Sequence, residues 1–120
     1  MLTPAEEQIM KHLWRLRHAF LRDLLEALPE PKPAKTTVST LLRRMTDKGL
    51  VDFRTYGNSR EYYPTVSKTA YFGRRLRGMV EDFFSENPRE LASLFAEDSQ
   101  LTREQLRELQ RIIGQKLEEE

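Results

Sequence analysis

Four hydroxyl side chains within seven residues, followed by two adjacent arginines, stand in one short segment, AKTTVSTLLRRMTDKGLV, residues 34–51. Hydroxyls hydrogen-bond phosphates and base edges, and the methyl group of Thr can touch the methyl group of thymine. Arg and Lys supply the positive charge that phosphates attract. These side chains therefore fit contact with nucleic acid. The candidate residues are Lys35, Thr36, Thr37, Ser39, Thr40, Arg43 and Arg44, with Lys48 as a further cation for phosphate.

The periodicity of this segment predicts an amphipathic helix over residues 36–48. Wound at about 100° per residue, its apolar side chains fall within one narrow arc, made by Val38, Leu41, Leu42 and Met45. Thr36, Thr40 and Arg43 fall on the opposite side, and Gly49 ends the helix. The hydroxyls therefore line the exposed face. An ordinary solvated helix that is rich in Thr explains this segment alone equally well.

The elements around this helix favour the nucleic-acid interpretation. Residues 50–56 alternate as a strand, GNS at 57–59 signals a tight turn, and residues 60–66 return as a second strand. Asn58 and Arg60 at this turn suit contact with phosphates or a minor groove. Two helices precede the segment, over about residues 3–14 and 20–28, and the proline-rich connector 29–33 follows them. Three helices and a hairpin form the order of a winged helix-turn-helix.

The first predicted helix carries strong start signals. Thr3 is placed as N-cap, Pro4 at the first helical position, and Glu6 at the capping-box spacing. An apolar face follows at helical spacing, formed by Ile9, Met10, Leu13 and Trp14.

The remainder of the chain predicts three more helices, over residues 66–84, 89–98 and 101–120. Ser67 is the expected cap of the first of these helices, and Thr102 with Gln105 has capping-box spacing in the last. A stripe of Leu106, Leu109, Ile113 and Leu117 is more apolar surface than a 120-residue monomer can readily bury. We therefore expect self-association. A dimer suits the reading of a two-fold operator by two recognition helices.

Charge is divided unevenly along the chain. The net charge is +1, but residues 1–80 hold 15 Lys and Arg against 8 Asp and Glu, a net +7, whereas residues 81–120 carry −6. A basic part can face a polyanion, although ordinary solvated surface fits equally well. The chain has no Cys, no apolar run near the roughly 20 residues that span a bilayer, and no signal-peptide pattern. We expect a cytoplasmic protein without membrane insertion.

Catalytic signatures are missing from the sequence. It holds no Ser/His/Asp grouping in a supporting context, no Gly-rich phosphate loop and no cluster of metal ligands. We therefore expect that the protein is not an enzyme and that it has no cofactor and no metal site.

The order of these motifs resembles the BlaI/MecI/CopY family of bacterial repressors, the penicillinase and methicillin-resistance repressors and their relatives. The matching stretches are LTPAEEQIMKHLW, TTVSTLLRRMTDKGLV, GNSREYYPTVS and LFAEDSQLTREQLRELQRII. The resemblance implies a homodimeric repressor that binds a dyad operator in double-stranded DNA. It adds Tyr62 to the wing and implies a dimer interface, for which the expected residues are Phe72, Leu76, Met79, Leu91, Leu94, Leu106, Leu109 and Ile113.

Two departures from the family pattern concern regulation. Members that control β-lactam resistance are cleaved at an Asn–Phe bond, whereas the matching dipeptide here is Leu94–Phe95. This bond is the candidate cleavage site, and the resemblance also allows for a membrane sensor or protease acting upstream. Copper-responsive members carry a C-terminal Cys cluster, which this chain lacks.

We therefore expect a mainly α-helical chain with a small β-hairpin wing. Residues 1–66 are the predicted winged-helix DNA-binding domain, and residues 67–120 are the predicted helical dimerisation domain. The alternative function is a protein-interaction module in which the basic face of the winged helix docks an acidic protein partner.

Overall fold

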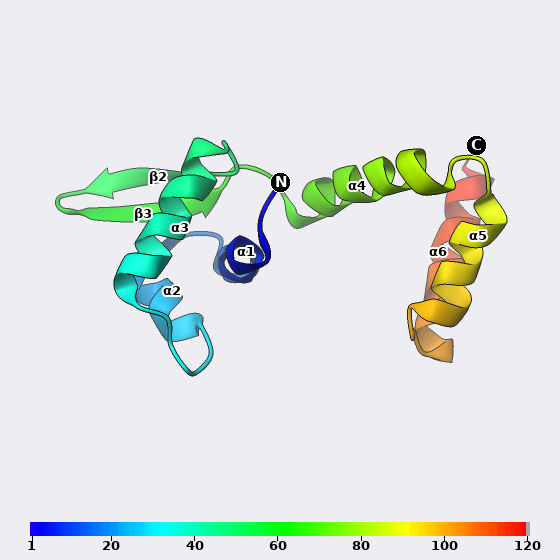
Figure 1. Cartoon of the computed structure of the whole chain (residues 1–120), viewed down its shortest axis with the longest axis horizontal. Coiled ribbons are helices and arrows are strands. Elements are labelled where there is room, and N and C mark those ends of the chain that lie inside the picture. Colours follow the sequence, from blue (N-terminus) through cyan, green and yellow to red (C-terminus); the bar gives the residue numbers. More distant parts are fainter. Residues whose placement is uncertain (120) are drawn as a thin grey trace. The chain divides into compact units, whose positions relative to one another are not determined.

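The computed structural model describes residues 1–119 and divides the chain into two units, Met1–Phe72 and Gly73–Glu120. We call Met1–Phe72 the winged-helix unit (Figure 1). Its elements are α1 (Pro4–Leu16), β1 (Ala19–Phe20), α2 (Leu21–Ala27), α3 (Lys35–Asp47), β2 (Val51–Tyr56), β3 (Ser59–Pro64) and the start of α4 (Lys68–Met79). The predicted fold class, mainly helical with a hairpin wing, is confirmed.

The core of this unit lies between its three helices and the sheet. The capping box predicted at the start of α1 is present, with Thr3 and Glu6 each accepting a backbone hydrogen bond from the other. This box fixes the first turn, and the apolar face behind it is buried. Fully buried side chains come from all three helices and β2, among them Ile9, Met10, Leu13, Leu24, Val38, Leu42, Met45 and Val51.

The sheet has three strands in the order β1–β3–β2, all antiparallel. Its hairpin turns at Gly57 and Asn58, and Gly57 has φ +60°, a conformation that glycine adopts without steric cost. The third strand, β1, is a feature that the sequence pattern does not predict. A strand of two residues is too short to show a periodic pattern. Ala19 and Phe20 are extended because they pair with Tyr62 and Glu61.

The end of α2 is stabilised by a lysine from the proline-rich connector. Lys32 Nζ donates to the carbonyl oxygens of Leu25 at 2.8 Å, Glu26 at 3.0 Å and Leu28 at 2.7 Å. The last carbonyls of a helix lack intrahelical partners, and a cation near them is also favoured by the helix dipole. Lys32 therefore supplies a side-chain cap to the end of α2.

Substitution of Lys32 by Met is expected to lower the free energy of unfolding by about 1 kcal/mol, since three carbonyl oxygens lose a charged donor but keep access to water. Urea unfolding followed by the fluorescence of Trp14, the only Trp of the chain, measures the change. Lys11→Met, at an exposed position of α1, is the matched control and should be neutral. Equal effects of the two substitutions would contradict the capping role.

The second unit contains the rest of α4, followed by η1 (Val80–Phe84), α5 (Pro88–Ser93), η2 (Leu94–Asp98) and α6 (Arg103–Glu118). We call it the helical unit. The predicted caps are present: Ser67 Oγ accepts from Ala70 N at the start of α4, and Thr102 and Gln105 form a capping box at the start of α6. The two η segments, which continue α4 and α5 with wider π-helical turns, were not predicted.

The two units meet between Phe72 and Gly73, whereas the expected domain boundary lies between residues 66 and 67. Tyr71, in the first turn of α4, is only 6% exposed and belongs to the core of the winged-helix unit. Residues 1–72 carry 12 Lys and Arg against 8 Asp and Glu, a net +4. Arg74, Arg75 and Arg77 therefore lie on the helical unit. The roles expected for the two regions stay predictions.

Candidate nucleic-acid interface

The candidate residues of α3 occupy the exposed side of that helix. Val38, Leu42 and Met45 are buried, which turns the opposite face outward. Thr40 is half-buried, and its hydroxyl donates to the carbonyl oxygen of Thr36 at 2.9 Å. That hydroxyl oxygen keeps its acceptor capacity. The exposed candidates on this face are Lys35, Thr36, Thr37, Ser39, Arg43 and Arg44.

An open groove of about 800 Å³ runs between α2, α3 and the wing. It brings together seven of the ten candidate residues, from two elements that are separate in sequence. The other three, Thr36, Thr37 and Arg44, are on α3 outside the groove lining. The seven that line it are Lys35, Ser39, Thr40, Arg43, Asn58, Arg60 and Tyr62.

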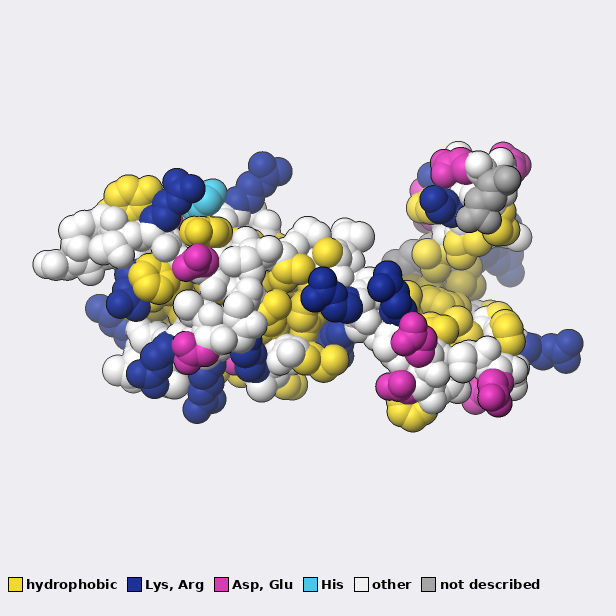
Figure 2. All heavy atoms as spheres, turned by 90° about the horizontal axis from the view of Figure 1, so that it is seen from above, with side chains coloured by type: hydrophobic (Ala, Val, Ile, Leu, Met, Phe, Trp, Pro, Cys, Tyr) yellow, Lys and Arg dark blue, Asp and Glu magenta, His cyan; other side chains and the backbone are white. Residues whose placement is uncertain are grey.

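The groove lining is strongly basic. Four cations, Arg22, Lys35, Arg43 and Arg60, line it with a single carboxylate, Asp47. Figure 2 shows dark blue Lys and Arg side chains outnumbering magenta Asp and Glu side chains on the visible face of the winged-helix unit. Focused positive charge in a concave surface attracts a polyanion. The groove therefore suits a phosphate backbone beside the exposed face of α3.

Arg22 is a groove residue that the sequence analysis missed. It follows the first residue of α2, and its guanidinium carbon lies 5.3 Å from the centroid of the Phe20 ring. The first helix of a helix-turn-helix crosses the backbone of DNA, so a cation at the start of α2 is a signal that sequence reasoning could have used.

Aromatic side chains hold the wing residues in place. The Arg60 guanidinium carbon lies 4.3 Å from the centroid of the Phe53 ring, a cation–π contact across the hairpin. Tyr62 is half-buried and packs on Phe53, with ring centroids 5.7 Å apart. Asn58, at the turn, is exposed. The tip therefore offers Asn58 and an oriented Arg60, while Tyr62 mainly supports the base of the wing.

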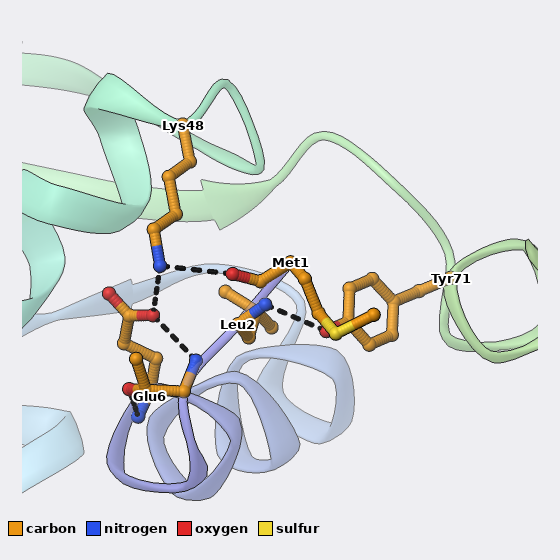
Figure 3. Close-up of polar contacts among 6 residues, drawn as sticks. Met1, Leu2, Glu6, Lys48 and Tyr71 are labelled. Carbon is orange, nitrogen blue, oxygen red and sulfur yellow. Dashed lines mark hydrogen bonds and ion pairs between the residues drawn. The ribbon is translucent and has the colours of Figure 1, made fainter. Parts of the chain in front are cut away.

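The contacts that Lys48 makes in the structure differ from the phosphate contact expected from the sequence. Its Nζ lies 2.6 Å from Glu6 Oε1 and 3.0 Å from the carbonyl oxygen of Met1, as Figure 3 shows. Burial opposes ionisation of Glu6, but hydrogen bonds from Lys48 and Thr3 outweigh it and hold the pKa of this carboxyl below its ordinary value of 4.5. Lys48 thus forms an ion pair within the winged-helix unit, in which Glu6 is buried and Lys48 is partly exposed.

The residues expected at a dimer interface lie at or near the surface of each unit. Phe72, Leu76, Met79 and Ile113 are exposed, and Leu91, Leu94, Leu106 and Leu109 are half-buried. Phe72 also contacts Trp14 and Tyr71 within the winged-helix unit. The Leu94–Phe95 bond begins η2. Ser99 donates its backbone N–H to the carbonyl oxygen of Leu94 and its hydroxyl to the carbonyl oxygen of Phe95.

Two kinds of feature are absent from the part of the chain that the structure describes. Over residues 1–119, no helix is long and apolar enough to cross a membrane. The same residues hold no group of three or more His, Cys, Asp or Glu placed to bind a metal ion.

Known proteins with similar sequences are bacterial regulators. The methicillin resistance regulatory protein MecI of Staphylococcus aureus (strain N315) is 22% identical over 116 residues, which cover 96% of this chain and 94% of that protein. The penicillinase repressor of Bacillus licheniformis is 22% identical over 113 residues, which cover 93% of this chain and 88% of that protein.

Solved structures share the fold. The solution structure of the DNA binding domain of the repressor BlaI has a TM-score of 0.53 at 22% identity, and covers 59% of this chain and 88% of that one. A complex structure of hsRosR-S4 has a TM-score of 0.53 at 17% identity, and covers 82% of this chain and 90% of that one. The family model described as penicillinase repressor matches residues 2–115. The chain therefore belongs to the penicillinase repressor family.

Proposed function

We propose that this protein is a homodimeric bacterial transcriptional repressor that binds a dyad operator in double-stranded DNA. The observation that carries the proposal is the groove that joins α3 to the wing, with four cations on its lining and hydroxyl side chains beside them. The family is one of repressors, not of enzymes. Such a regulator acts on DNA in the cytoplasm.

Each part of the interface has a distinct role in this proposal. The hydroxyls of α3 on its outward face and in the groove, Thr36, Ser39 and Thr40, read base edges in the major groove. Arg43, Arg44 and Arg22 contact phosphates, which orient the protein without reading sequence. Asn58 and Arg60 at the wing reach the neighbouring phosphates or the minor groove.

The exposure of the helical unit supports the homodimer. No residue of 73–119 is buried, although this stretch contains many large apolar side chains. Figure 2 shows yellow hydrophobic side chains at the surface of this unit. Apolar surface on this scale gains stability when a partner covers it. A second copy is the partner that also supplies a second recognition helix for a dyad.

The function is tested by fluorescence anisotropy with a duplex from upstream of the protein's own gene, against a scrambled duplex, at two salt concentrations. We expect a preference of about 10³-fold or more and a steep loss of affinity with salt. A duplex selected from a genomic library replaces the first probe if the operator lies elsewhere. Equal weak binding to every duplex would contradict the proposal and favour the acidic protein partner as the ligand of the basic face.

Substitutions on α3 are expected to separate specificity from affinity. Thr36→Ala combined with Thr40→Ala should change which bases are preferred, by about 1–3 kcal/mol per lost contact. Arg44→Ala should weaken binding to all sequences about equally and reduce the salt dependence, because a phosphate contact reads no sequence. Selection from a randomised library measures both effects. An unchanged base preference in the double Thr variant would contradict the assignment of α3 as the recognition helix.

Regulation by cleavage at Leu94–Phe95, and an upstream membrane sensor or protease, stay predictions. In the structure this bond lies within a helical segment, and Phe95 is 37% exposed. A protease would have to unwind η2 locally in order to bind the bond in extended form.

A further inference from the structure

The wing carries an arginine–aromatic contact on each face of its hairpin. On the face that lines the groove, the Arg60 guanidinium carbon lies 4.3 Å from the centroid of the Phe53 ring. Successive side chains of a strand alternate between faces, so Arg54 belongs to the opposite face. Its guanidinium carbon lies 5.9 Å from the centroid of the Tyr63 ring, and neither of these two residues lines the groove. The two contacts have similar chemistry, but only the first lies beside the candidate nucleic-acid interface.

The strand register explains why Arg60 lies over Phe53. Phe53 pairs with Tyr62, and Thr55 pairs with Arg60. Paired residues share a face with those two positions along the strand, so Arg60 is the diagonal neighbour of Phe53. A guanidinium over the face of a ring is attracted to it, and Tyr62 packs on the same ring with centroids 5.7 Å apart. Although Arg60 is exposed, its side chain therefore has a preferred direction.

The groove between α3 and the wing determines which part of a DNA duplex the wing meets. A sugar–phosphate strand is the ridge that separates the major groove of a duplex from its minor groove. When α3 enters the major groove, a strand that lies in the protein groove has the minor groove on its other side. That side faces the wing, from which Asn58 and Arg60 line the protein groove. The wing is thus placed at a minor groove.

We propose that Arg60, held by Phe53, enters the minor groove beside each operator half-site and selects A·T-rich sequence there. The inference rests on the proposed function, and it chooses the minor groove over a phosphate as the contact of the wing. A·T-rich stretches have a narrow minor groove with enhanced negative potential, which attracts Arg. The Asn58 side chain at the turn adds a donor for the acceptors N3 of adenine and O2 of thymine.

Phe53 is a positioning residue in this proposal, because it acts through Arg60 and not on DNA. A guanidinium is more weakly hydrated than an ammonium, so it loses less when it leaves water for a confined groove. A side chain that already lies along a ring also loses less conformational freedom on binding. Removal of the ring should therefore weaken the contribution of Arg60 even though Arg60 itself is unchanged.

The test uses the full chain and an operator duplex selected from a random library. Its half-sites are kept, and the base pairs on both sides of each half-site are made A·T, G·C or inosine·cytosine. An inosine·cytosine pair presents the major-groove acceptors of G·C but lacks the amino group that G·C places in the minor groove. Fluorescence anisotropy should show about tenfold tighter binding to the A·T and inosine·cytosine flanks than to the G·C flanks.

Substitutions in the wing test the two roles separately. Arg60→Gln should remove the flank preference. Phe53→Leu, which replaces the ring by an aliphatic side chain, should reduce it about threefold or more, whereas Phe53→Tyr, which keeps the ring, should retain it. Tyr63→Leu is the matched control, since it removes the ring of the other arginine–aromatic contact and should leave the preference unchanged. Trp14 fluorescence checks that each variant is folded at the assay temperature.

Several results would overturn the inference. Equal binding of wild type to all three flanks, or a preference that persists in Arg60→Gln, would mean that Arg60 does not read the minor groove. Inosine·cytosine flanks that bind like G·C flanks would place the reading in the major groove. A loss in Phe53→Leu that is equal for every flank would mean that the ring only stabilises the wing. Failure of wild type to select any duplex over scrambled DNA would instead overturn the proposed function, and the inference with it.

Discussion

Replacing Lys48 with Met is expected to lower the free energy of unfolding of the winged-helix unit by about 3 kcal/mol at pH 7. The Glu6 side chain is only 1% exposed, and its second oxygen has no hydrogen-bond partner among residues 1–119. Without Lys48, a carboxylate would remain buried with a single backbone donor. The loss in the free energy of unfolding is limited to about 3 kcal/mol, because at a larger penalty the Glu6 carboxyl would take up a proton instead. Urea unfolding followed by Trp14 fluorescence measures the change.

The pH dependence of this effect identifies its cause. In wild type the folded-state pKa of Glu6 is lowered, so its contribution is complete above the ordinary value of 4.5 and is lost as pH falls through the folded-state pKa. In Lys48→Met, burial is no longer outweighed by Lys48, and the folded-state pKa should lie above that value. The variant then regains relative stability as pH falls. The difference between the two proteins should narrow from pH 7 toward pH 4.

Lys11→Met is the matched control for this experiment, since it removes a lysine from an exposed position of α1. It should have little effect at any pH. A difference between wild type and Lys48→Met that does not change between pH 7 and pH 4 would contradict the role of the ion pair with buried Glu6. The loss of stability would then come from changed packing of the aliphatic part of the Lys48 side chain.

Features that depend on neighbouring residues were predictable from the sequence. The capping boxes at Thr3 and Thr102 are each defined by a spacing of three residues, and both are present. The buried face of α3 follows from helical periodicity, which placed Val38, Leu42 and Met45 together. The hairpin follows from the turn at Gly57. In each case the signal and the structure lie within one element.

Features that depend on distant residues were not predictable. Lys48 looked like a phosphate contact because it follows Arg43 and Arg44, but its partner Glu6 is 42 residues away in sequence. β1 forms because Ala19 meets Tyr62 in the tertiary structure. The place of Arg22 beside α3 likewise depends on how α2 packs. The candidate residues could be named from the sequence. That seven of them line one groove, and that Lys48 pairs with Glu6 instead, could be seen only in the fold.

In the helical unit the helices were predictable from the sequence, but many of their large apolar side chains are exposed. Exposed large side chains include Phe83 at 75%, Leu117 at 65% and Ile113 at 58%. Fully burying one such side chain contributes about 1.5–3 kcal/mol. A second copy that covers several of them would stabilise both the unit and the dimer. A charge placed in the apolar stripe of α6 should therefore weaken the dimer and, through it, operator binding.

Ile113→Glu is expected to dissociate the dimer and to lower affinity for a dyad operator about 10³-fold, since linked binding of two half-sites adds about 10²- to 10⁴-fold over one. Sedimentation velocity measures the oligomeric state, and fluorescence anisotropy measures the affinity. Gln115→Glu is the matched control: it adds the same charge to an exposed position about 200° around α6 from Ile113. It should leave both properties near those of wild type. A dimeric Ile113→Glu variant with full affinity would contradict the assignment of this stripe to the interface, whereas a monomer with full affinity would mean that one recognition helix is sufficient for binding.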